Sequence, residues 1–248
     1  MEQQRQCHNM QISGITFSGI TIYEAGSSLG STASLGTPTL SNVTTVANTV
    51  TSFGTSTNCY SFAGNTTSYT TYAGQSGFAV GTGDYTVEWF QYETDTNAFP
   101  RIFWYGTTPS LGVSIENGSF YTWPSPSLLK SGLSQKNAWR HFALVRISGR
   151  AYLYYEGALQ NAGGTADTRN VTDTTSTFYI GSKAGGGLSS EQYGGLITSF
   201  RFCKGVGVYT GNFTVPTSKL AQTQGANPYG GSNTSAISAG QCTILMNP

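Results

Sequence analysis

The chain has 248 residues, of which 9 % are charged and 13 % are aromatic, and its formal net charge is +1. A charge this small, with no run of Lys or Arg, excludes the basic surface that binding to nucleic acid or to an anionic membrane requires. Hydrophobic residues make up 38 % of the chain, which is enough for a packed core and excludes a disordered chain.

The first 39 residues differ in composition from the rest. Within residues 11–23 the sequence ISGITFSGITIY holds a short tandem repeat, and residues 24–39 are rich in Gly, Ser and Thr. Neither stretch can close a core of its own. The sequence therefore predicts an N-terminal arm and linker over 1–39, which pairs elsewhere, and one domain over 40–248.

The N-terminus lacks the apolar stretch of a secretory signal, and no window is apolar and long enough to span a bilayer. Because the sequence starts with Met1, we expect a chain that is made and used without Sec export.

Strand patterns then follow at close spacing, and no helical period of ten or more residues occurs. The clearest is GDYTVEWFQYET over 83–94, whose alternation places Tyr85, Val87 and Trp89 on one face and Thr86, Glu88 and Phe90 on the other. Asn117-Gly118 predicts a two-residue hairpin turn. The expected strands lie in residues 58–64, 68–74, 83–94, 101–106, 111–118, 118–123, 139–160, 176–183, 194–205 and 241–248.

Six blocks over about residues 58–220 are similar, in order, to the laminin G-like branch of the concanavalin A-like superfamily. They read YSFAGNTTSYTTY, FAVGTGDYTVEWFQY, NAWRHFALVR, AYLYYEGALQ, FYIGS and GGLITSFRFCKGVGVYTGNFTVPTSKL. In the character of their sequence they resemble the copies found in structural proteins of marine phages and other viruses. The resemblance implies an all-β fold, a two-sheet antiparallel jelly-roll sandwich.

The resemblance also implies structural roles for several matched residues. Trp139 and Phe142 are expected in the core, His141 as a structural hydrogen-bonding residue, and Glu88 paired with a nearby Arg or backbone amide. Where relatives carry Asp-Gly after the YLYY strand, this chain has Glu156-Gly157. Glu tolerates a left-handed turn less well than Asp, so the type of this turn stays open.

Glycoside hydrolases of the same superfamily carry two or three acids on one face of one strand, at the separation that a retaining mechanism needs. Glu88 and Glu93 are five residues apart and point to opposite faces of a regular strand. Glu93 and Asp95 share a face but lack a third acid. We therefore predict that the chain is not an enzyme and that it has no catalytic residues.

Metal and redox cofactors find little support in the sequence, and we expect none. Some relatives bind calcium, but Asp84, Asp95, Asp167 and Asp173 are dispersed, so only one or two of them, with carbonyl groups, could hold such an ion. Cys7, Cys59, Cys203 and Cys242 form no CxxC pair, and Cys59 and Cys203 lie in strand patterns, where thiols are usually buried and free.

Exposed aromatic rings beside polar groups are what a sugar site needs, and Trp104, Tyr121 and Trp123 are the candidates. Trp123 stands in the Pro-rich stretch YTWPSP, and it either forms a sugar platform or caps the core.

Two functions remain open. The first is a non-enzymatic virion structural protein, a capsid-decorating or fibre-associated subunit made in the host cytoplasm, with other virion proteins and further copies of itself as partners. The alternative is a carbohydrate-binding module for attachment to host or surface glycans.

Overall fold

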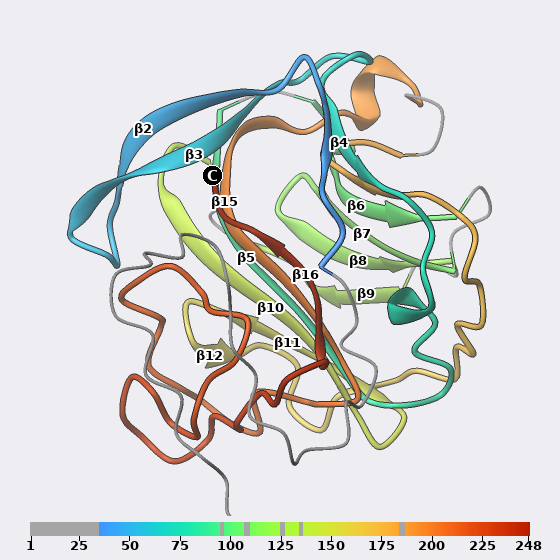
Figure 1. The fold of residues 1–248 in the computed structure, drawn as a ribbon, viewed down its shortest axis with the longest axis vertical. Coiled ribbons are helices and arrows are strands. Elements are labelled where there is room, and N and C mark those ends of the chain that lie inside the picture. The colour runs from blue at the N-terminus through green and yellow to red at the C-terminus, as the bar shows by residue number, and fades with distance from the viewer. Residues whose placement is uncertain (1–34, 95–96, 107–109, 125–126, 134–135, 184–186) are drawn as a thin grey trace, which may run out of the picture. The chain divides into compact units, whose positions relative to one another are not determined.

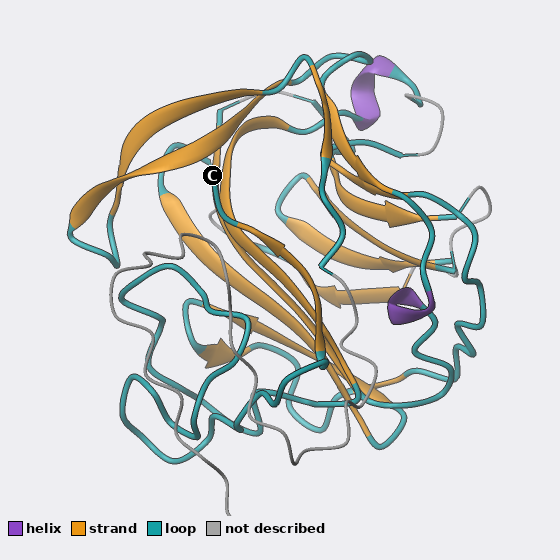
Figure 2. Cartoon of the chain, viewed as in Figure 1, coloured by secondary structure: helices purple, strands orange, loops and turns teal. Residues whose placement is uncertain are grey.

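Two antiparallel sheets form a sandwich in the computed structural model, which describes residues 35–94, 97–106, 110–124, 127–133, 136–183 and 187–248. Figure 1 shows the two layers, and Figure 2 shows how little of the described chain is helical. Only two short 3-10 turns, Ser76–Phe78 and Ser189–Glu191, occur among these residues. The predicted all-β jelly-roll sandwich is therefore confirmed. None of the helices within the described ranges has the length and hydropathy to cross a membrane.

The first sheet has seven strands in the order β1-β4-β14-β6-β7-β8-β9. The strands are β1 (Thr39–Ser41), β4 (Tyr69–Tyr72), β6 (Arg101–Tyr105), β7 (Leu111–Glu116), β8 (Ser119–Trp123), β9 (Ser127–Lys130) and β14 (Phe178–Ile180). β1 begins one residue before the boundary expected from the sequence, and the arm itself lies almost wholly outside the described residues.

The second sheet has nine strands, seven of them in the order β12-β11-β10-β5-β15-β3-β2, while β13 pairs with β11 and β16 pairs with β15. The strands are β2 (Thr44–Val50), β3 (Thr55–Ala63), β5 (Tyr85–Glu93), β10 (Trp139–Ile147), β11 (Arg150–Tyr155), β12 (Ala158–Leu159), β13 (Thr165–Ala166), β15 (Gly194–Lys204) and β16 (Cys242–Met246).

The core between the sheets is built of aromatic rings around Trp89. Its ring stacks on Phe120, Phe142 and Phe200 at centroid distances of 6.3, 5.5 and 6.1 Å. Alternation along β5 sends Tyr85, Val87 and Trp89 into this core. Phe142 lies there as predicted, whereas Trp139 is buried on the other face of its sheet, beside Phe90.

The outer face of the nine-stranded sheet is covered by the segment of residues 205–241. Val208, Tyr209 and Ile237 from this segment pack on Ala143 and Val145 of β10. β5 is consequently buried on both faces, which explains why its polar positions are as inaccessible as its apolar ones.

Hairpin turns follow the pattern that the sequence predicts. Asn117 and Gly118 have φ of 48° and 76°, and Ser148 and Gly149 have 49° and 72°. Glu156, the unexpected turn residue, also takes a positive φ of 49° before Gly157 at 75°. Positive φ at both central residues is the left-handed geometry of a type I′ turn, so Glu156 adopts it in spite of its side chain.

The cysteines that the structure describes, Cys59, Cys203 and Cys242, are buried free thiols. The prediction of free thiols holds for these three, and Cys7 lies outside the described residues.

Candidate functional site

A row of aromatic residues crosses the outer face of the seven-stranded sheet. The strand register sets Tyr179 opposite Trp104, Trp104 opposite Gly112, and Gly112 opposite Trp123. Directly opposite residues in a sheet share one face. Tyr69 joins one end of this row, because its ring lies 5.8 Å from that of Tyr179.

Tyr121 lies beside the row, two residues before Trp123 and on the same face of β8. We call Tyr69, Tyr179, Trp104, Trp123 and Tyr121 the aromatic stripe. Tyr69, Tyr121, Trp123 and Tyr179 are partly exposed, whereas Trp104 is only 6 % exposed.

Trp104 and Trp123 form one packed unit with Arg101. Their ring centroids are 5.7 Å apart, and the Arg101 guanidinium lies 5.5 Å from the first ring and 4.8 Å from the second. Gly112 makes this packing possible, because a Cβ there would lie 3.0 Å from the Trp104 ring. Trp104 therefore supports Trp123 from below. The Trp104 Nε1 has no hydrogen-bond partner in the described part of the chain.

Three further charged side chains, Glu116, Glu191 and Lys183, surround this unit. Arg101 donates from Nη1 to Glu116 Oε1 at 2.7 Å and from Nη2 to Glu191 Oε1 at 3.0 Å, and Lys183 Nζ lies 2.8 Å from Glu191 Oε2. Burial alone would raise the pKa of Glu191, but the Leu188 N–H, Lys183 and Arg101 lower it. These partners thus favour the ionised form of Glu191.

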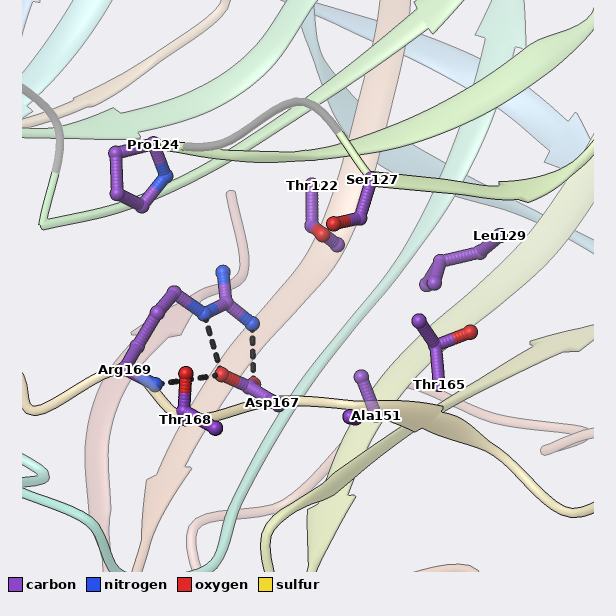
Figure 3. Close-up of a pocket in the computed structure, with 10 residues that line it drawn as sticks. Thr122, Pro124, Ser127, Leu129, Ala151, Thr165, Asp167, Thr168 and Arg169 are labelled. Carbon is purple, nitrogen blue, oxygen red and sulfur yellow. Dashed lines mark hydrogen bonds and ion pairs between the residues drawn. The ribbon is translucent and has the colours of Figure 1, made fainter.

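A pocket of about 110 Å³ opens at the edge of the sandwich, beside the end of β8 (Figure 3). Thr122, Pro124 and Ser127 line one side, and the paired Asp167 and Arg169 face them. Arg169 also donates to the Trp123 carbonyl oxygen at 2.8 Å, which ties this edge to the aromatic stripe.

The Asp167 carboxylate in this pocket is already neutralised. Arg169 donates to both of its oxygens, and Tyr85 Oη donates to Oδ2 at 3.3 Å. Burial would raise the pKa of Asp167, but Arg169 and Arg146 lower it. This pair serves to join the two sheets.

The two acids on β5, Glu88 and Glu93, point to opposite faces of the sheet. Glu88 points to the outer face, where Arg201 donates from Nε and Nη2 at 2.9 and 2.6 Å and Tyr209 Oη donates at 2.7 Å. The predicted pairing of Glu88 with an Arg is confirmed. Glu93 points the other way and lies within 3.6 Å of Lys136 Nζ. Asp95 lies outside the described residues.

His141 belongs to the same buried network as Glu88. Its ring is fully buried, and Nε2 lies 3.4 Å from Glu88 Oε2. Burial would raise the pKa of Glu88, but Arg201, with contributions from His141 and Tyr209, holds it at about 2. A carboxylate fixed in this way accepts hydrogen bonds and has no proton to donate near neutral pH.

A larger hollow of about 380 Å³ lies over the outer end of the nine-stranded sheet. Phe90, Trp139 and Val215 make its apolar lining. Its one carboxylate, Glu156, accepts the His141 backbone N–H and lies 3.8 Å from Arg140. Among the described residues that line it, the hollow therefore has no pair of acids of the kind that glycoside hydrolysis uses.

The three described aspartates that the sequence singled out for calcium are engaged elsewhere. Asp84 accepts the Ser148 N–H, Asp173 accepts those of Thr175 and Ser176, and Asp167 binds Arg169. Within the described ranges, no group of three or more His, Cys, Asp or Glu side chains could hold a metal ion.

The sequence profile of the concanavalin A-like lectin/glucanases superfamily matches residues 63–206. This match spans more than half of the chain. The chain belongs to the concanavalin A-like lectin/glucanases superfamily. No functionally curated protein matches its sequence.

Three solved structures are similar to this concanavalin A-like chain, and the first of them agrees with the two-sheet architecture. Domain 4 of an extracellular arabinanase from Geobacillus stearothermophilus, in complex with arabinotriose, superposes with a TM-score of 0.51 at 15 % identity, over 68 % of this chain and 82 % of the other. A pentraxin from Limulus polyphemus gives 0.40 at 17 % identity, over 48 % and 63 %, and a sialidase from Trypanosoma rangeli gives 0.44 at 14 % identity, over 64 % and 26 %.

On this concanavalin A-like sandwich the three sugar candidates named from the sequence lie together on one face. Trp123 is not a cap of the core, because it packs on Trp104 outside the seven-stranded sheet. Sequence reasoning missed Arg101, Glu116, Glu191, Tyr69 and Tyr179 as neighbours of this site. Alternation along each strand could have assigned their faces, but only the register between strands brings them together.

Proposed function

We propose that this chain is a non-catalytic carbohydrate-binding module, and that its site is the aromatic stripe on the seven-stranded sheet. The partly exposed rings of Tyr69, Tyr121, Trp123 and Tyr179 carry the proposal. Sugar rings present flat C–H faces that pack on aromatic rings, while their hydroxyl groups need polar partners close by. Glu116, which is more exposed than Arg101 and Glu191, supplies such a partner beside the stripe.

The length of the stripe favours an oligosaccharide over a single sugar. Neighbouring strands lie about 4.8 Å apart, so the four steps from β4 to β8 span about 19 Å. This length accommodates several sugar rings in a row. The arabinanase domain of the same fold is a complex with arabinotriose, which makes short arabinan chains a sensible first ligand.

Binding of arabinotriose and a panel of neutral oligosaccharides, measured by calorimetry on the full chain, tests the proposal. Trp123→Ala and Tyr121→Ala should each weaken binding at least about tenfold, as loss of a central aromatic contact does. Tyr229→Ala is the matched control, because this half-buried tyrosine belongs to the segment that covers the other sheet.

Circular dichroism should show that each variant keeps the β-sheet profile. Wild-type protein that binds no oligosaccharide of the panel, or stripe variants that bind as wild type does, would overturn the proposal.

The virion interpretation, which the sequence favoured first, now ranks second. Neither the family match nor the similar structures described above point to a viral protein, and no finding supports a viral origin. Location in a particle made in the host cytoplasm, and assembly with virion proteins or further copies, stay predictions. A glycan-binding module could serve such a particle as an attachment device, so the two interpretations are compatible.

A further inference from the structure

The cations beside the aromatic stripe are already matched by carboxylates. Arg101 donates from Nη1 to Glu116 and from Nη2 to Glu191. Lys183 Nζ donates to Glu191 Oε1 at 3.0 Å and lies 2.8 Å from Glu191 Oε2. Arg101 is also packed against two indole rings and is 7 % exposed. An incoming anion would have to displace a bound carboxylate before it gained a partner in this cluster.

Glu116 is more exposed to solvent than the guanidinium that it binds. Its side chain is 18 % exposed, against 7 % for Arg101. Oε1 accepts from Arg101 and from Ser114 Oγ, both at 2.7 Å, while Oε2 has no hydrogen-bond partner within the described ranges. Next to Trp123 the cluster therefore offers a ligand a negatively charged acceptor.

From this arrangement we infer that the aromatic stripe selects uncharged glycans over acidic ones, and that Glu116 determines the selection. The inference rests on the proposed function and names the ligand class of the same site. A neutral sugar donates a hydroxyl hydrogen bond to Glu116 Oε2. The carboxylate of a uronic or sialic acid brought to the same place meets a like charge at short range, which opposes binding.

Lys130 is a cation of the same sheet that lies outside this cluster. It lies on the edge strand β9, opposite Phe120 of β8 in the strand register. The cluster around Arg101 centres on β6 and β7, so Lys130 stands to one side of it. This position makes Lys130 a useful control.

Full-length protein on an array of oligosaccharides, printed as neutral and uronic-acid versions of the same chains, provides the test. At an ionic strength of about 0.01 M, where screening extends to about 30 Å, the acidic version of a bound glycan should bind at least about tenfold more weakly. In about 1 M salt, which screens within about 3 Å, the difference should shrink.

Glu116→Gln should reduce the difference between neutral and acidic glycans to about threefold or less at low salt, because the amide keeps an acceptor for Arg101 and removes the charge. Lys130→Gln should leave the difference unchanged within about twofold. An unchanged thermal melting temperature for both variants excludes a folding defect.

Acidic glycans that bind as tightly as their neutral versions would overturn the inference and leave the proposed function standing. A preference for neutral glycans that persists in Glu116→Gln would also overturn it, because another residue would then set the selection. If no glycan of either kind binds, the proposed function itself fails.

Discussion

Glu88 shows how a residue that suggests catalysis from its sequence context can be structural. It is an acid on the clearest strand of the sequence, yet Arg201, Tyr209 and His141 surround it under the segment of residues 205–241. Two fully buried charges in contact are costly to separate, because the one left behind has no water to solvate it. Because Tyr209 donates to Glu88 and Arg201 donates to the Ala221 carbonyl oxygen, the pair also binds the covering segment to the sheet.

Glu88→Gln should lower the free energy of unfolding at neutral pH by about 3 kcal/mol, since it leaves the Arg201 charge buried without its anion. Glu156→Gln is the matched control, because the pair that it affects is 3.8 Å apart with side chains 28 % and 39 % exposed. Exposed pairs contribute about 0–1 kcal/mol. Urea unfolding of the three proteins measures the difference.

The same variant should change the response to acid. The pKa of Glu88 in the folded chain is about 2, below its value of about 4.3 in an unfolded chain. Its contribution to stability is complete above about pH 5 and is lost as the pH falls toward 2. Wild-type stability should fall over this window more steeply than that of Glu88→Gln. Parallel curves for the two proteins would show that Glu88 is not the titrating group.

At the scale of single elements, two hairpin turns share nearly the same backbone conformation, so a residue that suits one turn can be tested in the other. Ser148-Gly149 and Asn117-Gly118 have φ values within 4° of each other at both central positions. The left-handed conformation costs a residue with a Cβ about 1–2 kcal/mol of free energy. Asn adopts it more readily than Ser, because the Asn side-chain amide forms hydrogen bonds with the nearby backbone.

Ser148→Asn should therefore stabilise the fold by a few tenths to about 1 kcal/mol, and Asn117→Ser should destabilise it by a similar amount. The Ser148 backbone N–H that binds Asp84 is untouched by the exchange. Thermal unfolding, followed by circular dichroism, measures both changes. Shifts of the same sign for the two variants would contradict the argument.

Elements with strong local patterns could be predicted from the sequence, and those defined by their neighbours could not. β5 and its alternation were predicted because apolar residues recur with a period of two. β2 was missed, since its sequence TTVANTV is mostly polar and its exposed edge gives no hydrophobic pattern. β9 was missed for a related reason, because its four residues are too few to show a period.

At the scale of the whole molecule, the candidate site depends on the assembly of strands far apart in sequence. Tyr69 and Tyr179 meet because β4 and β14 are neighbours in the sheet, although 110 residues separate them along the chain. The sequence could nominate Trp104, Tyr121 and Trp123, which stand close together in the chain. It could not nominate Arg101 with Glu191, because their contact needs the finished sheet.

The distribution of acids over the described residues predicts that the chain does not hydrolyse glycans. Glu88 and Glu93 lie on opposite faces of β5, and Glu88 is held by Arg201. Prolonged incubation with the oligosaccharides that bind best should give no shorter products by anion-exchange chromatography. Turnover that disappears in Glu93→Gln would contradict this expectation.

The position of β16 has a consequence for how the molecule folds during synthesis. β16 pairs with Phe200–Cys203 of β15, and Ile244 and Met246 belong to the core around Trp89. β15 in turn pairs with β3, about 135 residues earlier in the chain. A ribosome releases these partners in order, so the part of β15 that pairs with β16 stays uncovered until residue 246 has emerged from the exit tunnel. Until then the aromatic core lacks Ile244 and Met246 and is partly exposed. Strands so far apart in sequence pair slowly, and nascent chains can associate with one another during this time.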